Sequence, residues 1–184
     1  SNYNFLLNNL RDIERTGDIR SYKKDLVDLY VNRDQHSFST QVTDLDNIQN
    51  PSIHSLLSSK YHEAQMHRLN IHAEIPDPVI HNYLTDLDLA VVLGHLMDNA
   101  IDGARKASEG FISLAYFDEE DCQSFIIEST IAEEQVPLSM MSTQLPHPEG
   151  GIGVNAVQDI LERYPNTSFS VRSQNHKMMQ ILEM

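Results

Sequence analysis

The spacing of the apolar residues changes repeatedly after residue 50, and this alternation is what most limits the fold. Helical spacing, with apolar residues three and four apart, covers residues 51–67, 86–106 and 153–164. Patterns typical of strands cover residues 69–75, 112–116, 124–127, 167–172 and 177–183. Runs of strands with helices that can cover one face predict an α+β fold, a two-layer sandwich.

Two of the expected helices carry start signals. Asn50 can cap a helix that has Pro51 at its first position, where the missing amide of proline costs nothing. Thr85 and Asp88 have the spacing of a capping box, in which Thr85 covers an amide of the first turn and Asp88 reaches back. We therefore expect one helix to begin at residue 51 and a long one to begin at residue 86.

A different pattern precedes residue 50. Two short stripes of apolar residues have coiled-coil-like spacing: Tyr3, Leu6, Leu10 and Ile13, then Ile19, Tyr22, Leu26 and Leu29. Gly17 can end the first helix and Asp18 can cap the second. The sequence thus predicts an antiparallel helical hairpin over residues 1–48, before a domain of residues 49–184. Two hairpins can pair into a homodimeric four-helix bundle, and packing on the same chain is the alternative.

The 184 residues carry a formal net charge of −14, with 13 Lys and Arg against 27 Asp and Glu. A field of this sign repels phosphate and anionic lipid, which argues against nucleic-acid binding and membrane contact, and also disfavours ATP. No apolar run reaches the ~20 residues of a membrane helix. The single cysteine, Cys122, fits a reducing compartment. We expect an intracellular chain, and Ser1 in place of Met indicates a fragment.

The helix expected over residues 86–106 carries a polar stripe beside its apolar face. The stripe repeats at spacings of three and four residues: His95, Asp98, Asn99, Asp102 and Lys106. The amide oxygen of Asn99 is a hard, neutral ligand that suits Mg²⁺ and can share the ion with triphosphate oxygens. A partly exposed polar face without a ligand is the plainer alternative.

A glycine-rich motif, Gly150-Gly151-Ile152-Gly153, opens the next helix. Glycines let backbone amides approach phosphates closely, and a helix amino terminus attracts anions. A loop end that caps a helix would explain the same residues. The preceding residues 130–149 have no clear period and predict a long mobile loop of the kind that often serves function.

Three segments in order, NPSIHSLLSSKYHEAQ, DLDLAVVLGHLMDNAIDGA and GGIGVNAVQDILERY, resemble the catalytic domain of peptide-pheromone (quorum-sensing) sensor histidine kinases of Gram-positive bacteria. These kinases belong to the GHKL ATPase superfamily. The resemblance implies a Bergerat-type sandwich with a mixed sheet, which binds ATP and Mg²⁺ between sheet and helices. Residues 130–149 would form the lid over this site. Asn99 would bind Mg²⁺, with His95 facing the same cleft, and Gly151 and Gly153 would form the glycine box.

The resemblance also assigns charges around the site. Asp102 suits this family, whereas many other histidine kinases have lysine there, so Arg105 or Lys106 is expected to meet the phosphates. Mg²⁺ and these cations set the local potential, which makes the charge of −14 tolerable. Ser129 stands where the family usually has asparagine, Ala156 also departs from its pattern, and no Asp-x-Gly-x-Gly motif for adenine is apparent.

The implied activity is that of the cytoplasmic kinase portion of an integral membrane two-component sensor. Such a kinase transfers the γ-phosphoryl group of ATP to a histidine and then to a response regulator. The phosphoacceptor histidine would fall at or before Ser1, so this chain is expected to bind nucleotide without phosphorylating itself. Ser129, Ala156 and the missing histidine motivate an alternative, a degenerate, non-catalytic dimerising module that docks a regulator. A GHKL serine kinase is a third possibility, which the hairpin disfavours.

Overall fold

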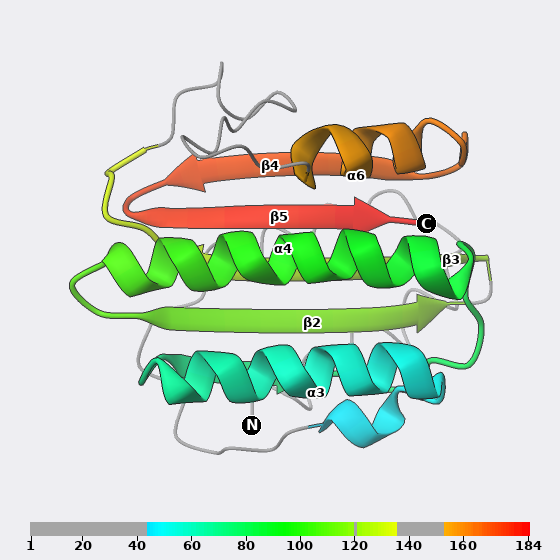
Figure 1. Cartoon of the computed structure of the whole chain (residues 1–184), viewed down its shortest axis with the longest axis horizontal. Coiled ribbons are helices and arrows are strands. Elements are labelled where there is room, and N and C mark those ends of the chain that lie inside the picture. The colour runs from blue at the N-terminus through cyan, green and yellow to red at the C-terminus, as the bar shows by residue number, and fades with distance from the viewer. Residues whose placement is uncertain (1–43, 120, 136–152) are drawn as a thin grey trace, which may run out of the picture. The chain divides into compact units, whose positions relative to one another are not determined.

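The computed structural model describes residues 44–119, 121–135 and 153–184 (Figure 1). Helices and strands in these ranges follow the order η2 (Asp44–Asn47), α3 (Pro51–Met66), β1 (Asn70–Glu74), α4 (Asp86–Lys106), β2 (Phe111–Glu119), β3 (Cys122–Thr130), α6 (Gly153–Leu161), β4 (Ser168–Gln174) and β5 (Lys177–Glu183). Every helix and strand that the sequence predicts after residue 50 is present. The helical hairpin expected over residues 1–48 lies almost wholly outside the described residues.

The five strands form one mixed sheet in the order β1-β2-β3-β5-β4. β1 runs parallel to β2, with Ile71 opposite Ile112, and the other three pairs are antiparallel. α4 connects the parallel pair, as a parallel connection requires a crossover. Helices α3, α4 and α6 lie in front of the sheet in Figure 1, all on one face. This arrangement is the α+β two-layer sandwich with a mixed sheet that the sequence predicts.

The hydrophobic core lies between the helices and the sheet, and α4 contributes most to it. The apolar face expected on α4 is fully buried: Leu89, Val92, Leu93, Leu96 and Ala100. Strands supply the opposing layer, for example Ile71, Leu114 and Leu182. Two buried rings, Tyr116 and Phe125, meet edge to face with centroids 5.5 Å apart and planes at 89°. This core fixes α4 against the centre of the sheet.

The two outer strands of the sheet differ in length and exposure. β1 has five residues, and β4 has seven, most of them at least partly exposed. The outward positions of β4 are polar, with Ser168, Ser170, Arg172 and Gln174 exposed. Phe169 and Val171 alternate with them and are only half-buried. β4 is therefore the most exposed strand of the sheet.

Both α3 and α4 begin where the sequence predicts, and only the expected role of Asp88 in the capping box is corrected. Asn50 Oδ1 accepts hydrogen bonds from the amides of Ser52 at 2.9 Å and Ile53 at 3.1 Å. Thr85 Oγ1 accepts the amide of Asp88 at 3.2 Å, which is half of the expected capping box. The amide of Thr85, which the box would pair with Asp88, donates instead to the hydroxyl of Tyr164 at 3.3 Å.

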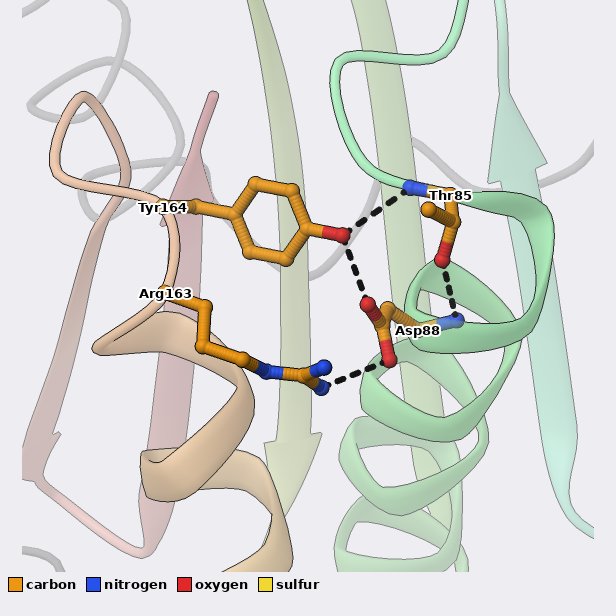
Figure 2. Close-up of polar contacts among 4 residues, drawn as sticks. All are labelled: Thr85, Asp88, Arg163 and Tyr164. Carbon is orange, nitrogen blue, oxygen red and sulfur yellow. Dashed lines mark hydrogen bonds and ion pairs between the residues drawn. The ribbon is translucent and has the colours of Figure 1, made fainter.

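The carboxylate of Asp88 points along the helical layer, toward the end of the neighbouring helix α6 (Figure 2). It accepts a hydrogen bond from the Tyr164 hydroxyl at 2.6 Å and one from Arg163 Nη2 at 2.8 Å. A cation and a phenol are stronger partners for a carboxylate than a backbone amide, which explains the correction. Tyr164 was expected on the helix itself, whereas α6 ends at Leu161 and Tyr164 follows in the turn. These contacts join the start of α4 to the end of α6.

We expect Tyr164→Phe to weaken this junction in a pH-dependent way. The Tyr164 hydroxyl is the main cause that holds the pKa of the Asp88 carboxyl below its ordinary value. A lowered pKa stabilises the fold above the ordinary carboxyl pKa, and that stability is lost as the pH falls through the folded-state pKa. In urea unfolding, the variant should have a lower midpoint than the parent at about pH 7, and the difference should shrink at about pH 3.

The matched control for this prediction is Tyr61→Phe. The Tyr61 hydroxyl donates to a backbone oxygen, that of Ile71, at 3.1 Å, so its loss involves no titrating partner. Its effect on the urea midpoint should be similar at both pH values. An equal pH dependence for the two variants would contradict the role of Tyr164 in lowering the pKa of Asp88.

Candidate functional site

The polar stripe of α4 divides into three parts in the structure. His95, Asn99 and Asp102 are half-buried. Asp98 turns toward α3, where its Oδ1 lies 2.5 Å from Lys60 Nζ. The two cations in the last turn, Arg105 and Lys106, are exposed. A candidate site on α4 thus centres on its half-buried polar residues, of which Asn99 contacts the sheet, with the cations at the end of the helix.

Asn99 is held from the sheet by a residue that sequence reasoning missed. Its amide nitrogen Nδ2 donates to Oε1 of Gln180 on β5 at 3.3 Å. Gln180 is 1% exposed, and its own Nε2 donates to the backbone oxygen of Leu96 at 3.0 Å. No described residue donates a hydrogen bond to Oδ1 of Asn99. This oxygen is therefore available to a ligand, while the nitrogen of the same amide is occupied.

One turn further along α4, Gly103 comes close to the end of β3. A Cβ atom at Gly103 would lie 3.0 Å from Cγ2 of Ile131, 3.4 Å from the backbone oxygen of Thr130 and 3.8 Å from Oγ of Ser129. Ser129 is 1% exposed, and its Oγ has no hydrogen-bond partner within the described ranges. An unpaired buried hydroxyl costs about 1–3 kcal/mol unless a water or ligand satisfies it. This position therefore suits a polar group of a bound molecule.

The donor set of this region fits a magnesium nucleotide. Asn99 offers one neutral amide oxygen, and Mg²⁺ in nucleotide sites takes few protein ligands and fills the rest with phosphate oxygens and water. The hydroxyl of Ser129 can donate to or accept from a base or a bound water. Arg105 Nη1 lies 3.9 Å from Asp102 Oδ1, a loose surface pair that leaves the guanidinium able to reorient toward phosphate.

The structure brings most of the predicted site residues to one region. His95, Asn99 and Asp102 lie on α4, and the backbone of Gly103 links this stripe to Ser129 on β3. Arg105 and Lys106 follow in the last turn of α4. Gly153 is the first residue of α6, as expected for the end of the glycine motif. Gly151 and residues 136–149 of the expected lid lie outside the described residues.

Gln180 could have been noticed from a break in the strand pattern. Residues Met178 to Leu182 of β5 are all buried, and Gln180 is the one polar residue in this apolar run. A glutamine at a core position requires internal partners. The pattern does not show which helix supplies them, because β5 and α4 are about 80 residues apart in the chain.

Comparisons with known proteins support the same fold. Residues 84–184 match the family described as the GHKL domain. The nucleotide-free catalytic domain of histidine kinase ThkA superposes with a TM-score of 0.61 at 13% identity, over 74% of this chain and 91% of that one. The mycobacterial sensor histidine kinase MprB gives a TM-score of 0.54 at 12% identity, over 72% and 93%. A search of curated proteins gives no match.

A third structure contains a partner. It is the crystal structure of histidine kinase ThkA in complex with the response regulator protein TrrA, with a TM-score of 0.58 at 13% identity, over 74% of this chain and 40% of that one. At these identities the structures establish the fold alone. None of the described helices is both long and apolar enough to cross a membrane. Because the GHKL match spans more than half of the sequence, the chain belongs to the GHKL domain family, with the catalytic-domain fold of histidine kinases.

Proposed function

We propose that this chain is the kinase portion of a two-component sensor, which binds Mg-ATP and presents its γ-phosphoryl group to a histidine. The observation that carries the proposal is the Asn99 amide, whose nitrogen is held by Gln180 while its oxygen stays open to a cation. The GHKL family match covers residues 84–184, which include Asn99, and because GHKL domains generally bind ATP, it supports this proposal. Bound Mg²⁺ would neutralise charge on the phosphates and so favour phosphoryl transfer.

The residues of the chain have separate roles in this proposal. Asn99 holds the cation through Oδ1, and His95 and Asp102 flank it on the same stripe of α4. Arg105 and Lys106 attract phosphates to the end of the helix. Ser129 pairs its buried hydroxyl with the base or with a water beside it. Backbone amides at Gly151 and Gly153 contact phosphate at the start of α6.

The proposed partners follow from the family and one neighbour. The complex of ThkA with TrrA supports a response regulator as the final phosphoryl acceptor. Residues 1–48 would form the hairpin of the homodimer, with the acceptor histidine at or before Ser1, and residues 49–184 would form the catalytic domain. We further propose that the parent protein is a membrane sensor of peptide pheromones, with this part in the cytoplasm.

Phosphate incorporation tests the kinase function against a non-catalytic docking role. The chain as given should bind Mg-ATP in calorimetry but incorporate no phosphate from γ-labelled ATP. A chain extended at its amino terminus by the native upstream residues should become labelled and pass the label to its response regulator. If the extended chain binds Mg-ATP and stays unlabelled, the kinase function is wrong and a docking module is favoured. If neither chain binds Mg-ATP, the nucleotide site itself is wrong.

A further inference from the structure

Gln180 places a polar amide within an apolar layer of the core. It is 1% exposed, and its neighbours on the same face of β5, Met178 and Leu182, are buried. An amide in such surroundings is destabilising unless its hydrogen bonds are satisfied. Both ends of this amide have a partner on α4, the backbone oxygen of Leu96 at 3.0 Å and the side chain of Asn99 at 3.3 Å.

The chemistry of these partners fixes the orientation of two amides in turn. The backbone oxygen of Leu96 can only accept a hydrogen bond, so the NH₂ group of Gln180 must face it. Oε1 of Gln180 then faces Asn99, and because this oxygen can only accept, Asn99 must offer its own NH₂ group. Reversing either amide would bring two oxygens or two NH₂ groups together. Oδ1 of Asn99 is therefore directed away from Gln180.

We infer that Gln180 is a positioning residue that presents the oxygen of Asn99 to the bound cation. The inference rests on the proposed Mg-ATP site and adds Gln180 as the residue that orients the metal ligand Asn99. Without Gln180, the amide of Asn99 can turn over and present its NH₂ group, which repels a cation. Residues that orient a metal ligand in this way typically change metal affinity by about 10–100-fold when they are replaced.

The first test compares Gln180→Met with the parent chain. Methionine has a similar length and no hydrogen-bonding amide, so it fills the space but releases Asn99. Calorimetry gives the ATP dissociation constant in EDTA and in Mg²⁺. The EDTA value divided by the Mg²⁺ value, here called the Mg²⁺ ratio, measures the contribution of Mg²⁺. This ratio should fall by about 10–100-fold in Gln180→Met, while ATP binding in EDTA changes little.

Gln123→Met is the matched control. Gln123 is also a fully buried glutamine, but it lies at the opposite end of β3 from Ser129 and pairs with Tyr116 and with the backbone oxygen of His81. Its loss should lower stability and leave the Mg²⁺ ratio unchanged. An equal fall in the ratio for both variants would attribute the effect to a loosened core and overturn the positioning role.

The same substitution in an Asn99→Asp chain separates an effect on the orientation of residue 99 from an effect on core packing. In Asn99→Asp, both oxygens of the carboxylate can bind a cation, so the orientation set by Gln180 no longer matters. Adding Gln180→Met to Asn99→Asp should leave the Mg²⁺ ratio within about twofold of the single variant. The same loss in both backgrounds would overturn the inference, because a residue that only packs would act equally on each.

An NMR measurement on the chain without nucleotide tests the orientation of Asn99 independently of ATP and Mg²⁺ binding. The side-chain NH₂ signals of Asn99 in a ¹⁵N NMR spectrum can be assigned by their loss in Asn99→Asp. They should shift in Gln180→Met and stay in place in Gln123→Met. Unchanged Asn99 signals, or Mg-ATP binding with an unchanged Mg²⁺ ratio, would overturn the inference alone. Absence of Mg-ATP binding by the parent chain would overturn the proposed function and this inference together.

Discussion

Asn99→Ala is expected to remove the contribution of Mg²⁺ to ATP binding. Loss of outer partners of a metal ligand already lowers metal affinity by about 10–100-fold, and loss of the ligand itself should be at least as severe. The affinity for ATP in Mg²⁺ should then fall to the value measured in EDTA. Calorimetry of the parent and the variant under both conditions checks this result.

Asp98→Ala is the control for this prediction. Asp98 directly precedes Asn99 on α4, but its carboxylate pairs with Lys60 on α3 at 2.5 Å and so belongs to the contact between the helices. Its replacement should leave the Mg²⁺ contribution intact. Asn99→Ala leaves Oε1 of the buried Gln180 without its partner, which costs about 1–3 kcal/mol. This cost is below the stability of a typical domain, about 5–15 kcal/mol, so the variant should stay folded, which circular dichroism checks. Unchanged Mg-ATP binding in Asn99→Ala would refute the proposed site.

Phe125→Ala is expected to have the largest effect on stability. The ring is fully buried in the central strand β3 and meets Tyr116 edge to face at 5.5 Å. Truncation of a buried phenylalanine costs about 3–5 kcal/mol through lost burial and the cavity that remains. Because domains are stable by only about 5–15 kcal/mol, the variant should lose much of its unfolding free energy in a urea titration.

Phe169→Ala provides the same chemical change at a different depth. Phe169 is half-buried on the outer strand β4, so less apolar surface is exposed by its truncation and the surroundings can relax. Its cost should be clearly smaller than that of Phe125→Ala. If the two variants lost equal stability, the core would not be centred on β3 as the structure has it.

The fold could be predicted largely because local signals agree with tertiary packing. The apolar face of α4 has helical spacing, and the same residues, such as Leu93 and Leu96, are the most deeply buried. Asn50 caps α3 as its position before Pro51 predicts. The strand order has no such local signal, since β5 inserts between β3 and β4, and only long-range pairing decides this.

The candidate site was less accessible to sequence reasoning because its geometry comes from distant contacts. The type and helical position of Asn99 indicated a ligand, but Gln180, which orients it, lies 81 positions away. The Thr85 half of the capping box forms, but its Asp88 half does not, for a similar reason, since Tyr164 and Arg163 at the end of α6 offer Asp88 better partners. Ser129 was identified by resemblance, and only the structure shows its hydroxyl to be buried without a partner in the described ranges.

The two outer strands of the sheet, β1 and β4, determine whether two copies of this chain could pair their sheets edge to edge. Exposed strand edges tend to pair with other chains and aggregate, and short strands or outward charges hinder such pairing. β1 is only five residues long, and the exposed residues of β4 are polar and include the cation Arg172. Both edges are thus poor templates for sheet extension between copies. Pairing of two sheets edge to edge is therefore not expected to compete with the proposed helical dimer.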